Sequence, residues 1–395
     1  MTKSKNDPVA LTAALVRCPS ITPHEGGALT YLANVLEPAG FRCHRLPFSA
    51  TETPDVDNLF ARIGSGDPHL CFAGHTDVVP PGDSGLWTHP PFAGETDGGF
   101  LYGRGAVDMK GDIACFVAAA LDFVADPERL GQGSISLLIT GDEEGPAING
   151  TVKVLQWMAA NGQTPSDCLV GEPSNPERLG DAIKIGRRGS LAARLFVRGK
   201  QGHAAYPQLA NNPLRGLVRL ATALNGLKLD AGTKQFQASN LEIVAIETGN
   251  QAFNVIPAAA EIRLNVRYND LHTAASLEAL IRREADAALA GSGLTLNAQF
   301  FSNAEAFLTK PGPLVQTMLA AVKAETGHIP ELSTTGGTSD ARFIKDYCPV
   351  IEFGLVNKTI HAVDERVEVK DLHSLTCIYR GFLERYFASG GAKVA

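Results

Sequence analysis

Short apolar runs and helical stretches alternate along the first half of the chain. Residues 69–73, 134–140 and 167–170 are apolar runs that each reach a glycine, which is typical of buried strands. The spacing of apolar residues predicts helices at 112–124 and 150–160. Strands that alternate with helices in this way indicate an α/β fold with a mainly parallel, doubly wound sheet.

The pattern changes near residue 187. The next elements follow the order β-α-β-β-α-β, with strands at 190–197, 240–247, 258–268 and 294–301 and helices at 212–224 and 276–289. This order is enough for a small α+β domain, and the strand-helix pattern resumes after it. We therefore predict one larger domain, formed by residues 1–187 and 302–395, with residues 188–301 inserted as a smaller α+β domain.

The composition is that of an ordinary globular protein and argues against several classes. The chain has 395 residues, of which 44% are hydrophobic and 19% are charged. A net charge of −7 without any basic block argues against nucleic-acid binding. No apolar run reaches the roughly 18 residues of a membrane span, and the N-terminus lacks the apolar core of a signal peptide. The seven cysteines include no Cys-x-x-Cys pair, which indicates reduced thiols in a cytoplasmic protein.

Acidic residues and histidines gather where the predicted strands end. The loops at the ends of the strands carry His75, Asp77, Asp108, Glu143, Glu144 and Glu172, and His361 follows later, just after a strand near residue 350. Because function in open α/β sheets collects at the carboxyl ends of the strands, we expect these side chains to converge. Clustered carboxylates repel one another in a low dielectric, and two divalent cations would remove that repulsion. Nitrogen and oxygen ligands of this kind suit zinc, with cobalt or manganese as substitutes.

Each of these residues also has an ordinary explanation when taken alone. Asp108 is placed to cap the helix that follows it. Glu143 and Glu144 have the character of solvated loop charges, Glu172 precedes a proline as turn residues do, and His361 could be a surface histidine. The metal-site hypothesis rests instead on every acid falling at the carboxyl end of a strand.

The adjacent pair Glu143–Glu144 suggests a division of roles. Neighbouring residues in a tight loop point to different sides, so one carboxylate can ligate a metal while the other stays free. A free carboxylate at such a site can take a proton from the attacking water and later deliver it to a leaving amine. The pair therefore favours amide hydrolysis.

Four motifs carry these residues: His75-Thr-Asp77-Val-Val-Pro, Gly103-Arg-Gly-Ala-Val-Asp108-Met-Lys-Gly, Asp142-Glu143-Glu144-Gly and Gly171-Glu172-Pro173. In order and spacing they resemble the signatures of the dinuclear zinc deacylase and aminopeptidase superfamily, over nearly the whole chain. The resemblance implies that His75, Asp108 and Glu172 hold one zinc. It implies that Asp108, Glu144 and His361 hold the other, so that Asp108 bridges the two. It also implies that Glu143 is the general base and acid and that Asp77 orients His75.

Further motifs include Lys184-Ile-Gly-Arg187-Arg188-Gly-Ser, Gly199-Lys-Gln-Gly-His203-Ala-Ala-Tyr206-Pro, Asn254-Val-Ile-Pro and Ser333-Thr-Thr-Gly336-Gly337-Thr338-Ser339-Asp340. These are similar to motifs of the bacterial succinyl-diaminopimelate desuccinylases. The resemblance implies hydrolysis of N-succinyl-LL-2,6-diaminopimelate to succinate and LL-2,6-diaminopimelate, with two Zn²⁺ per subunit in the larger, catalytic domain. It also implies a homodimer formed through the inserted domain, which would act as a lid, with His203 reaching the partner's active site to stabilise the oxyanion. Another N-acyl amino acid deacylase, such as an acetylornithine deacetylase, or a catalytically silent relative remains the alternative.

The carboxylates of such a substrate imply cationic and amide groups in the cleft. Along the strand at 261–268, apolar residues alternate with Arg263, Asn265 and Arg267. Arg267 is therefore predicted on the open face of the inserted domain, where it could bind a carboxylate with both arms of its guanidinium, although a solvated arginine is an equally ordinary explanation. The other candidate substrate-binding residues are Arg187, Asn254, Gly337 and Thr338.

Overall fold

The computed structural model describes residues 6–337 and 339–390, and it divides into two compact units. The larger unit comprises Met1–Ile185, Thr309–Ser333 and Ser339–Ala395, and the smaller unit comprises Gly186–Leu308 and Thr334–Thr338. The smaller unit therefore extends beyond the predicted segment 188–301 at both ends. It also includes the short segment at 334–338, which the sequence pattern had assigned to the larger domain.

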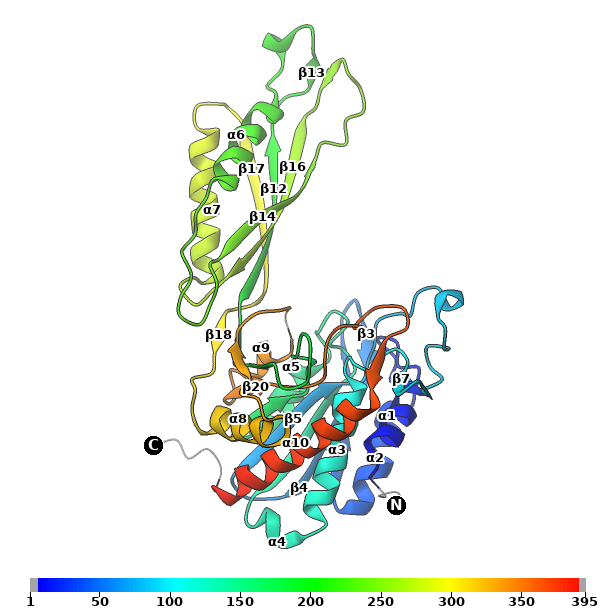
Figure 1. Cartoon of the computed structure of the whole chain (residues 1–395). Helices are drawn as coiled ribbons and strands as arrows, with labels where there is room; N and C mark the ends of the chain where they lie inside the picture. The colour runs from blue at the N-terminus through cyan, green and yellow to red at the C-terminus, as the bar shows by residue number, and fades with distance from the viewer. Residues whose placement is uncertain (1–5, 338, 391–395) are drawn as a thin grey trace. The chain divides into compact units, whose positions relative to one another are not determined.

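An eight-stranded sheet forms the centre of the larger unit (Figure 1). Its order is β1 (Arg42–Arg45), β4 (Leu59–Gly64), β8 (Ser134–Thr140), β5 (His69–His75), β9 (Asp167–Val170), β20 (Val350–Glu352), β10 (Ala182–Lys184) and β19 (Glu331–Ser333). The strands from β8 to β20 are parallel, whereas the β1–β4, β4–β8 and β20–β10 pairs are antiparallel. The predicted α/β class is confirmed, with a sheet that is mixed at its margins. Every residue of β5 and β8 is buried, which explains their continuous apolar sequences.

Helices pack against this sheet and against one another. The helices of the larger unit are α1 (Pro8–Val16), α2 (Ala28–Leu36), α3 (Lys110–Val124), α4 (Pro127–Leu130), α5 (Thr151–Ala160), α8 (Pro313–Thr326), α9 (Ala341–Ile344) and α10 (Val369–Ala388). Helix α3 lies between α1 and α10 and is buried along almost its whole length (Figure 1). Phe116 of α3 stacks on Phe72 of β5, with ring centroids 4.1 Å apart. This contact anchors the strand that ends at His75.

The segment at 79–102, between β5 and α3, is rich in proline and glycine but contains regular structure. It holds the 3₁₀ turn η2 (Ser84–Leu86) and the strands β6 (Glu95–Asp97) and β7 (Phe100–Tyr102). Strand β21 (Arg366–Glu368) pairs with β7 in an antiparallel manner. The segment that leads into α3 therefore lies beside the segment that leads into α10. A further short hairpin joins β2 (Phe48–Ala50) to β3 (Thr53–Val56).

The smaller unit has the predicted β-α-β-β-α-β order. Its elements are β12 (Gly189–Arg198), α6 (Pro213–Asn225), β14 (Asn240–Glu247), β16 (Ala259–Tyr268), α7 (Ala274–Leu289) and β17 (Thr295–Ala304), and its sheet order is β14-β16-β12-β17. Ile262, Leu264 and Val266 are buried in its core, whereas Arg267 is half-buried on the other face of β16, as the alternation predicts. The shorter strands are β11 (Gly186–Arg187) with β18 (Phe307–Leu308) and β13 (Gly202–His203) with β15 (Val255–Ile256). Within the described residues of both units, no helix has the length and apolar character needed to cross a membrane.

Candidate metal centre

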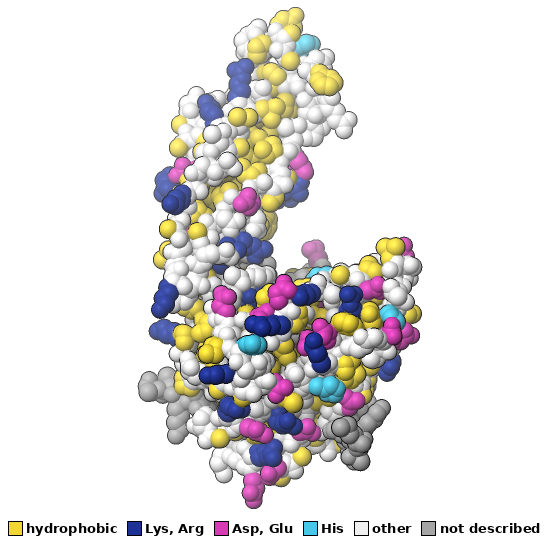
Figure 2. Space-filling view, in the orientation of Figure 1, with side chains coloured by type: hydrophobic (Ala, Val, Ile, Leu, Met, Phe, Trp, Pro, Cys, Tyr) yellow, Lys and Arg dark blue, Asp and Glu magenta, His cyan; other side chains and the backbone are white. Residues whose placement is uncertain are grey.

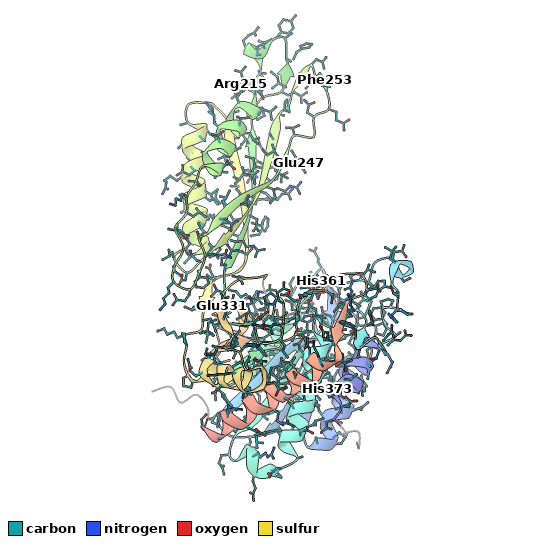
Figure 3. All side chains as sticks on the ribbon, viewed as in Figure 1. Arg215, Glu247, Phe253, Glu331, His361 and His373 are labelled. Atoms are coloured by element: carbon teal, nitrogen blue, oxygen red, sulfur yellow. The ribbon has the colours of Figure 1, made fainter. Side chains whose placement is uncertain are left out.

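The ends of three parallel strands bring most of the predicted ligands to one edge of the large sheet. His75 is the last residue of β5, Glu144 follows β8, and Glu172 follows β9. Asp108 lies just before α3, and His361 lies in the loop before β21, at the edge of the larger unit that carries these loops (Figure 3). His75, Asp108 and Glu144 each offer a ligand atom, and these atoms all lie within 4.8 Å of one another.

Asp108 stands between the two histidines. Its Oδ1 lies 3.1 Å from Nε2 of His75, and its Oδ2 lies 3.3 Å from Nε2 of His361. Oε1 of Glu144 is 2.7 Å from the same nitrogen of His361, and Oε1 of Glu172 is 3.9 Å from Nε2 of His75. One carboxylate with an oxygen toward each histidine is the arrangement that a bridging ligand between two cations needs.

The charges of the cluster depend on its burial. Burial raises the pKa of Glu143 to about 8. Burial, together with the charges of Asp108 and Glu143, raises the pKa of Glu172 well above its usual range. Burial also opposes ionisation of Asp108, but hydrogen bonds from His361 and His75 outweigh it and lower the pKa of that carboxyl.

The neighbouring carboxylates shift the pKa values of the two histidines upward. Hydrogen bonds to Asp108 and Glu144 raise the pKa of His361 to about 10. Burial disfavours the charged form of His75, yet its hydrogen bond to Asp108 raises its pKa well above the usual value. Nitrogen and oxygen donors that face one another in this way fit a pair of divalent cations.

Asp77 contacts two parts of the site, His75 and the loop that carries the two glutamates. Nδ1 of His75 donates to the backbone carbonyl of Asp77 at 2.9 Å, whereas the Asp77 carboxylate lies 3.7 Å from that nitrogen. The carboxylate instead accepts the backbone N–H groups of Glu143, at 3.2 Å, and Glu144, at 3.0 Å, and the hydroxyl of Thr22, at 2.7 Å. The expected orienting of His75 therefore comes from the main chain, and the side chain fixes the loop with the two glutamates.

Asp142 supports the site through contacts that the sequence pattern did not indicate. Its carboxylate accepts three backbone N–H groups of the segment at 147–149, from 2.8 to 3.2 Å. Together Asp77 and Asp142 bind the loop around Glu143 and Glu144 from two directions. The available signal was a third acid directly beside the glutamate pair.

His361 has an unusual backbone conformation. Its φ is 59°, in the left-handed region that non-glycine residues rarely adopt. Such a residue costs on the order of 1–3 kcal/mol and persists only where its surroundings hold it. Its side chain is 47% exposed, so the imidazole borders solvent while its Nε2 faces the cluster.

The predicted substrate-binding residues and His203 all belong to the smaller unit. Arg187 is buried, and its Nη1 donates to the backbone oxygens of Gly337, at 2.5 Å, and Thr335, at 3.4 Å. His203 is exposed in the β13–β15 ribbon, and its Nδ1 accepts the N–H of Ala205. Asn254 is exposed beside this ribbon, where its backbone oxygen accepts the N–H of Ala204. Thr338, also predicted, lies outside the described residues.

Comparisons with known proteins match nearly the whole chain. The model of peptidase family M20/M25/M40 matches residues 71–385. A succinyl-diaminopimelate desuccinylase of Methylorubrum populi is 58% identical over 390 residues, covering 98% of this chain and 100% of the relative. The protein of that name from Rhodopseudomonas palustris strain BisB5 is 56% identical over 387 residues, covering 98% and 100%.

Solved structures share the fold at much lower identity. The aminopeptidase PepT of Bacillus cereus has a TM-score of 0.80 at 18% identity and covers 97% of this chain and 98% of its own. The YXEP protein of Bacillus subtilis, described as a dinuclear metal-binding peptidase, has a TM-score of 0.70 at 16% identity, covering 95% and 96%. The match to the family model and the identity to full-length relatives lead to one conclusion: this chain belongs to peptidase family M20/M25/M40.

Proposed function

We propose that this protein hydrolyses N-succinyl-LL-2,6-diaminopimelate to succinate and LL-2,6-diaminopimelate, a step in lysine and diaminopimelate biosynthesis. The observation that carries the chemistry is the convergence of His75, Asp108 and Glu144 next to Glu143. Identity of 55–59% to desuccinylases over almost their full length supports the choice of substrate.

The proposed cofactor is a pair of Zn²⁺ ions, with Co²⁺ or Mn²⁺ as substitutes. One ion would be held by His75, Asp108 and Glu172, and the other by Asp108, Glu144 and His361. When bound, the ions would polarise the amide carbonyl and favour deprotonation of the attacking water. The distances of the two imidazoles from opposite oxygens of Asp108 support this assignment.

Glu143 is the proposed general base and acid. No hydrogen bond to its carboxylate is found among the residues that the structure describes, while its N–H is held by Asp77. Burial favours the neutral form of this carboxyl, and the charge of bound cations would favour the carboxylate, which would then accept a proton from water and deliver it to the leaving amine. Asp77 would act by holding this loop.

We propose that the smaller unit binds substrate and forms a homodimer. Arg187, Asn254, Arg267, Gly337 and Thr338 are the proposed substrate-binding residues, and His203 would stabilise the oxyanion in the partner's site. Strand β14 is an edge of its sheet and exposes Val244 and Ile246, 64% and 52% accessible, which supports pairing with a second copy. Hydrophobic side chains are visible on the surface of this unit (Figure 2). The free cysteines support a cytoplasmic location.

The test is amine release from N-succinyl-LL-2,6-diaminopimelate and from N-acetylornithine, with protein stripped of metal and then titrated with zinc. Zinc-dependent turnover of the succinyl substrate alone is the expected result. Turnover of N-acetylornithine instead would keep the metal chemistry and reject the proposed substrate. Absence of activity on both substrates, with or without zinc, would reject the proposal.

A further inference from the structure

A buried ion pair joins Arg104 to Glu365 in the larger unit. Nη1 of Arg104 lies 2.7 Å from Oε2 of Glu365, and the two side chains are 3% and 0% exposed. Neither residue belongs to the cluster of proposed metal ligands. Both lie on segments that carry one: Arg104 precedes Asp108, and Glu365 follows His361.

The glutamate holds the Asp108 segment. Its Oε1 accepts the backbone N–H of Val107, at 2.9 Å, and that of Asp108, at 3.2 Å. Its own backbone oxygen accepts the N–H of Gly103 at 2.9 Å. Three amides of the loop before α3 are thus bound by one residue of the loop before β21.

The arginine holds the His361 segment in return. Its Nη2 donates to the backbone oxygen of His361 and its Nη1 donates to that of Ala362, each at 3.3 Å. Its guanidinium carbon lies 5.2 Å from the centre of the Trp87 ring, which covers it. The carbonyl of His361 is therefore fixed where the backbone takes its left-handed conformation.

Fold stability alone is a weak reason for such a pair, because well-packed apolar residues often replace a buried ion pair at no cost. The contacts are specific to the two segments that place Asp108 and His361, whose Oδ2 and Nε2 atoms are 3.3 Å apart. We propose that Arg104 and Glu365 are positioning residues that set the spacing of Asp108 and His361 and thereby the affinity for the cation on the Glu144–His361 side. This inference rests on the proposed function, since it requires a metal at that position.

The test is the variant Arg104→Lys, measured by metal affinity. Lysine keeps the charge beside Glu365, but it lacks the planar fork that reaches a carboxylate and two carbonyls together. Loss of such support for a ligand typically weakens metal binding about 10–100-fold. We expect a loss of this size for one of two cations, in Co²⁺ titrations followed by the visible absorption of the bound ion and in Zn²⁺ competition with a chelator.

Arg62→Lys is the matched control. Arg62 is half-buried, and it donates to Gln163 and to the hydroxyl of Ser134, which lies at the end of the sheet opposite the proposed ligands. It should lose thermal stability to a similar degree and keep both metal affinities. Circular dichroism verifies folding, and Glu365→Gln, which keeps an acceptor for the Asp108 amide but removes the charge, replaces Arg104→Lys if the latter does not fold.

These measurements test the proposed function and the positioning role separately. If the wild-type protein binds neither Co²⁺ nor Zn²⁺, the proposed function fails. If the wild-type protein binds two cations and the folded variant binds both with unchanged affinity, the positioning role is wrong. An equal loss of affinity in Arg62→Lys would also overturn it, because the effect would then be a general consequence of destabilisation.

Discussion

Replacing Asp142 with asparagine should destabilise the larger unit and slow hydrolysis at the same time. Asp142 is 2% exposed. Its Oδ1 accepts the N–H of Ala147 at 3.2 Å, and its Oδ2 accepts those of Ile148 and Asn149 at 2.9 and 2.8 Å. These bonds close the segment that follows Glu143 and Glu144.

The size of the effect follows from the three bonds. In the D142N variant one carboxylate oxygen is replaced by an NH₂ group, which cannot accept a hydrogen bond. If the remaining oxygen takes the Oδ2 position, two bonds persist without the charge of the acceptor, at a cost of about 1 kcal/mol each. The N–H of Ala147 would face a donor, at a cost of about 1–3 kcal/mol. The free energy of unfolding should therefore fall by about 3–5 kcal/mol.

The assay combines urea unfolding of the metal-free protein with turnover at saturating zinc and substrate. Turnover should fall about 100-fold, because displacing a catalytic group by about 1 Å has an effect of that order. The control is Asp126→Asn at the start of α4, where an exposed carboxylate accepts one backbone N–H, from Glu128, and forms an exposed ion pair with Arg129. It should change stability by about 1 kcal/mol or less and leave turnover unchanged. A D142N protein that loses stability but keeps wild-type turnover would refute the role of this acid in placing the glutamates.

Glu143, His69 and the β14 edge can each be tested by substitution. Glu143→Gln should lower turnover by about 10²–10⁴-fold while the Zn²⁺ affinity stays close to wild type, and wild-type turnover in this variant would remove Glu143 from the mechanism. Burial lowers the pKa of His69 to about 4, below the value near 6.5 expected for the unfolded chain, so the unfolded chain takes up the proton first and stability falls as the pH drops from about 6.5 to about 4. His69→Gln should flatten this part of the curve of urea midpoint against pH, and an unchanged slope would contradict the assignment. Val244→Asp combined with Ile246→Asp should convert a dimer into a monomer in light scattering coupled to gel filtration, whereas a retained dimer would exclude the β14 edge as the interface.

The sequence was sufficient to place several candidate ligands at one edge of the sheet, because the end of each strand can be recognised from the residues around it. Once β5, β8 and β9 are recognised as parallel strands, His75, Glu144 and Glu172 must emerge at one edge. The position of His361 could not be predicted in this way, because its loop reaches that edge through the long-range pairing of β21 with β7. The short strand β7 lies in a segment rich in proline and glycine, and nothing in its own sequence indicates its distant partner.

The supporting acids could not be recognised in the same way. Asp142 and Glu365 act by accepting backbone N–H groups, and every residue except proline carries such a group. A sequence therefore shows where an acid lies but not which amides it faces. The same reason explains the contacts of Asp77, whose carboxylate accepts the amides of the glutamate loop while its backbone carbonyl accepts from His75.

The contacts that hold the candidate centre join residues that lie far apart in the sequence. Arg104 and Glu365 are 261 positions apart, and His361 meets Glu144 across 217 positions. The sheet alone places the residues at the strand ends, because β5, β8 and β9 are packed in the core on both faces. Asp108 and His361 lie on loops, so their spacing depends on the buried pair Arg104–Glu365 and on the pairing of β7 with β21. Asp108 would bridge both cations, so the loops that carry Asp108 and His361 determine whether the two metals are held together. The sheet alone would not be enough without these loop contacts.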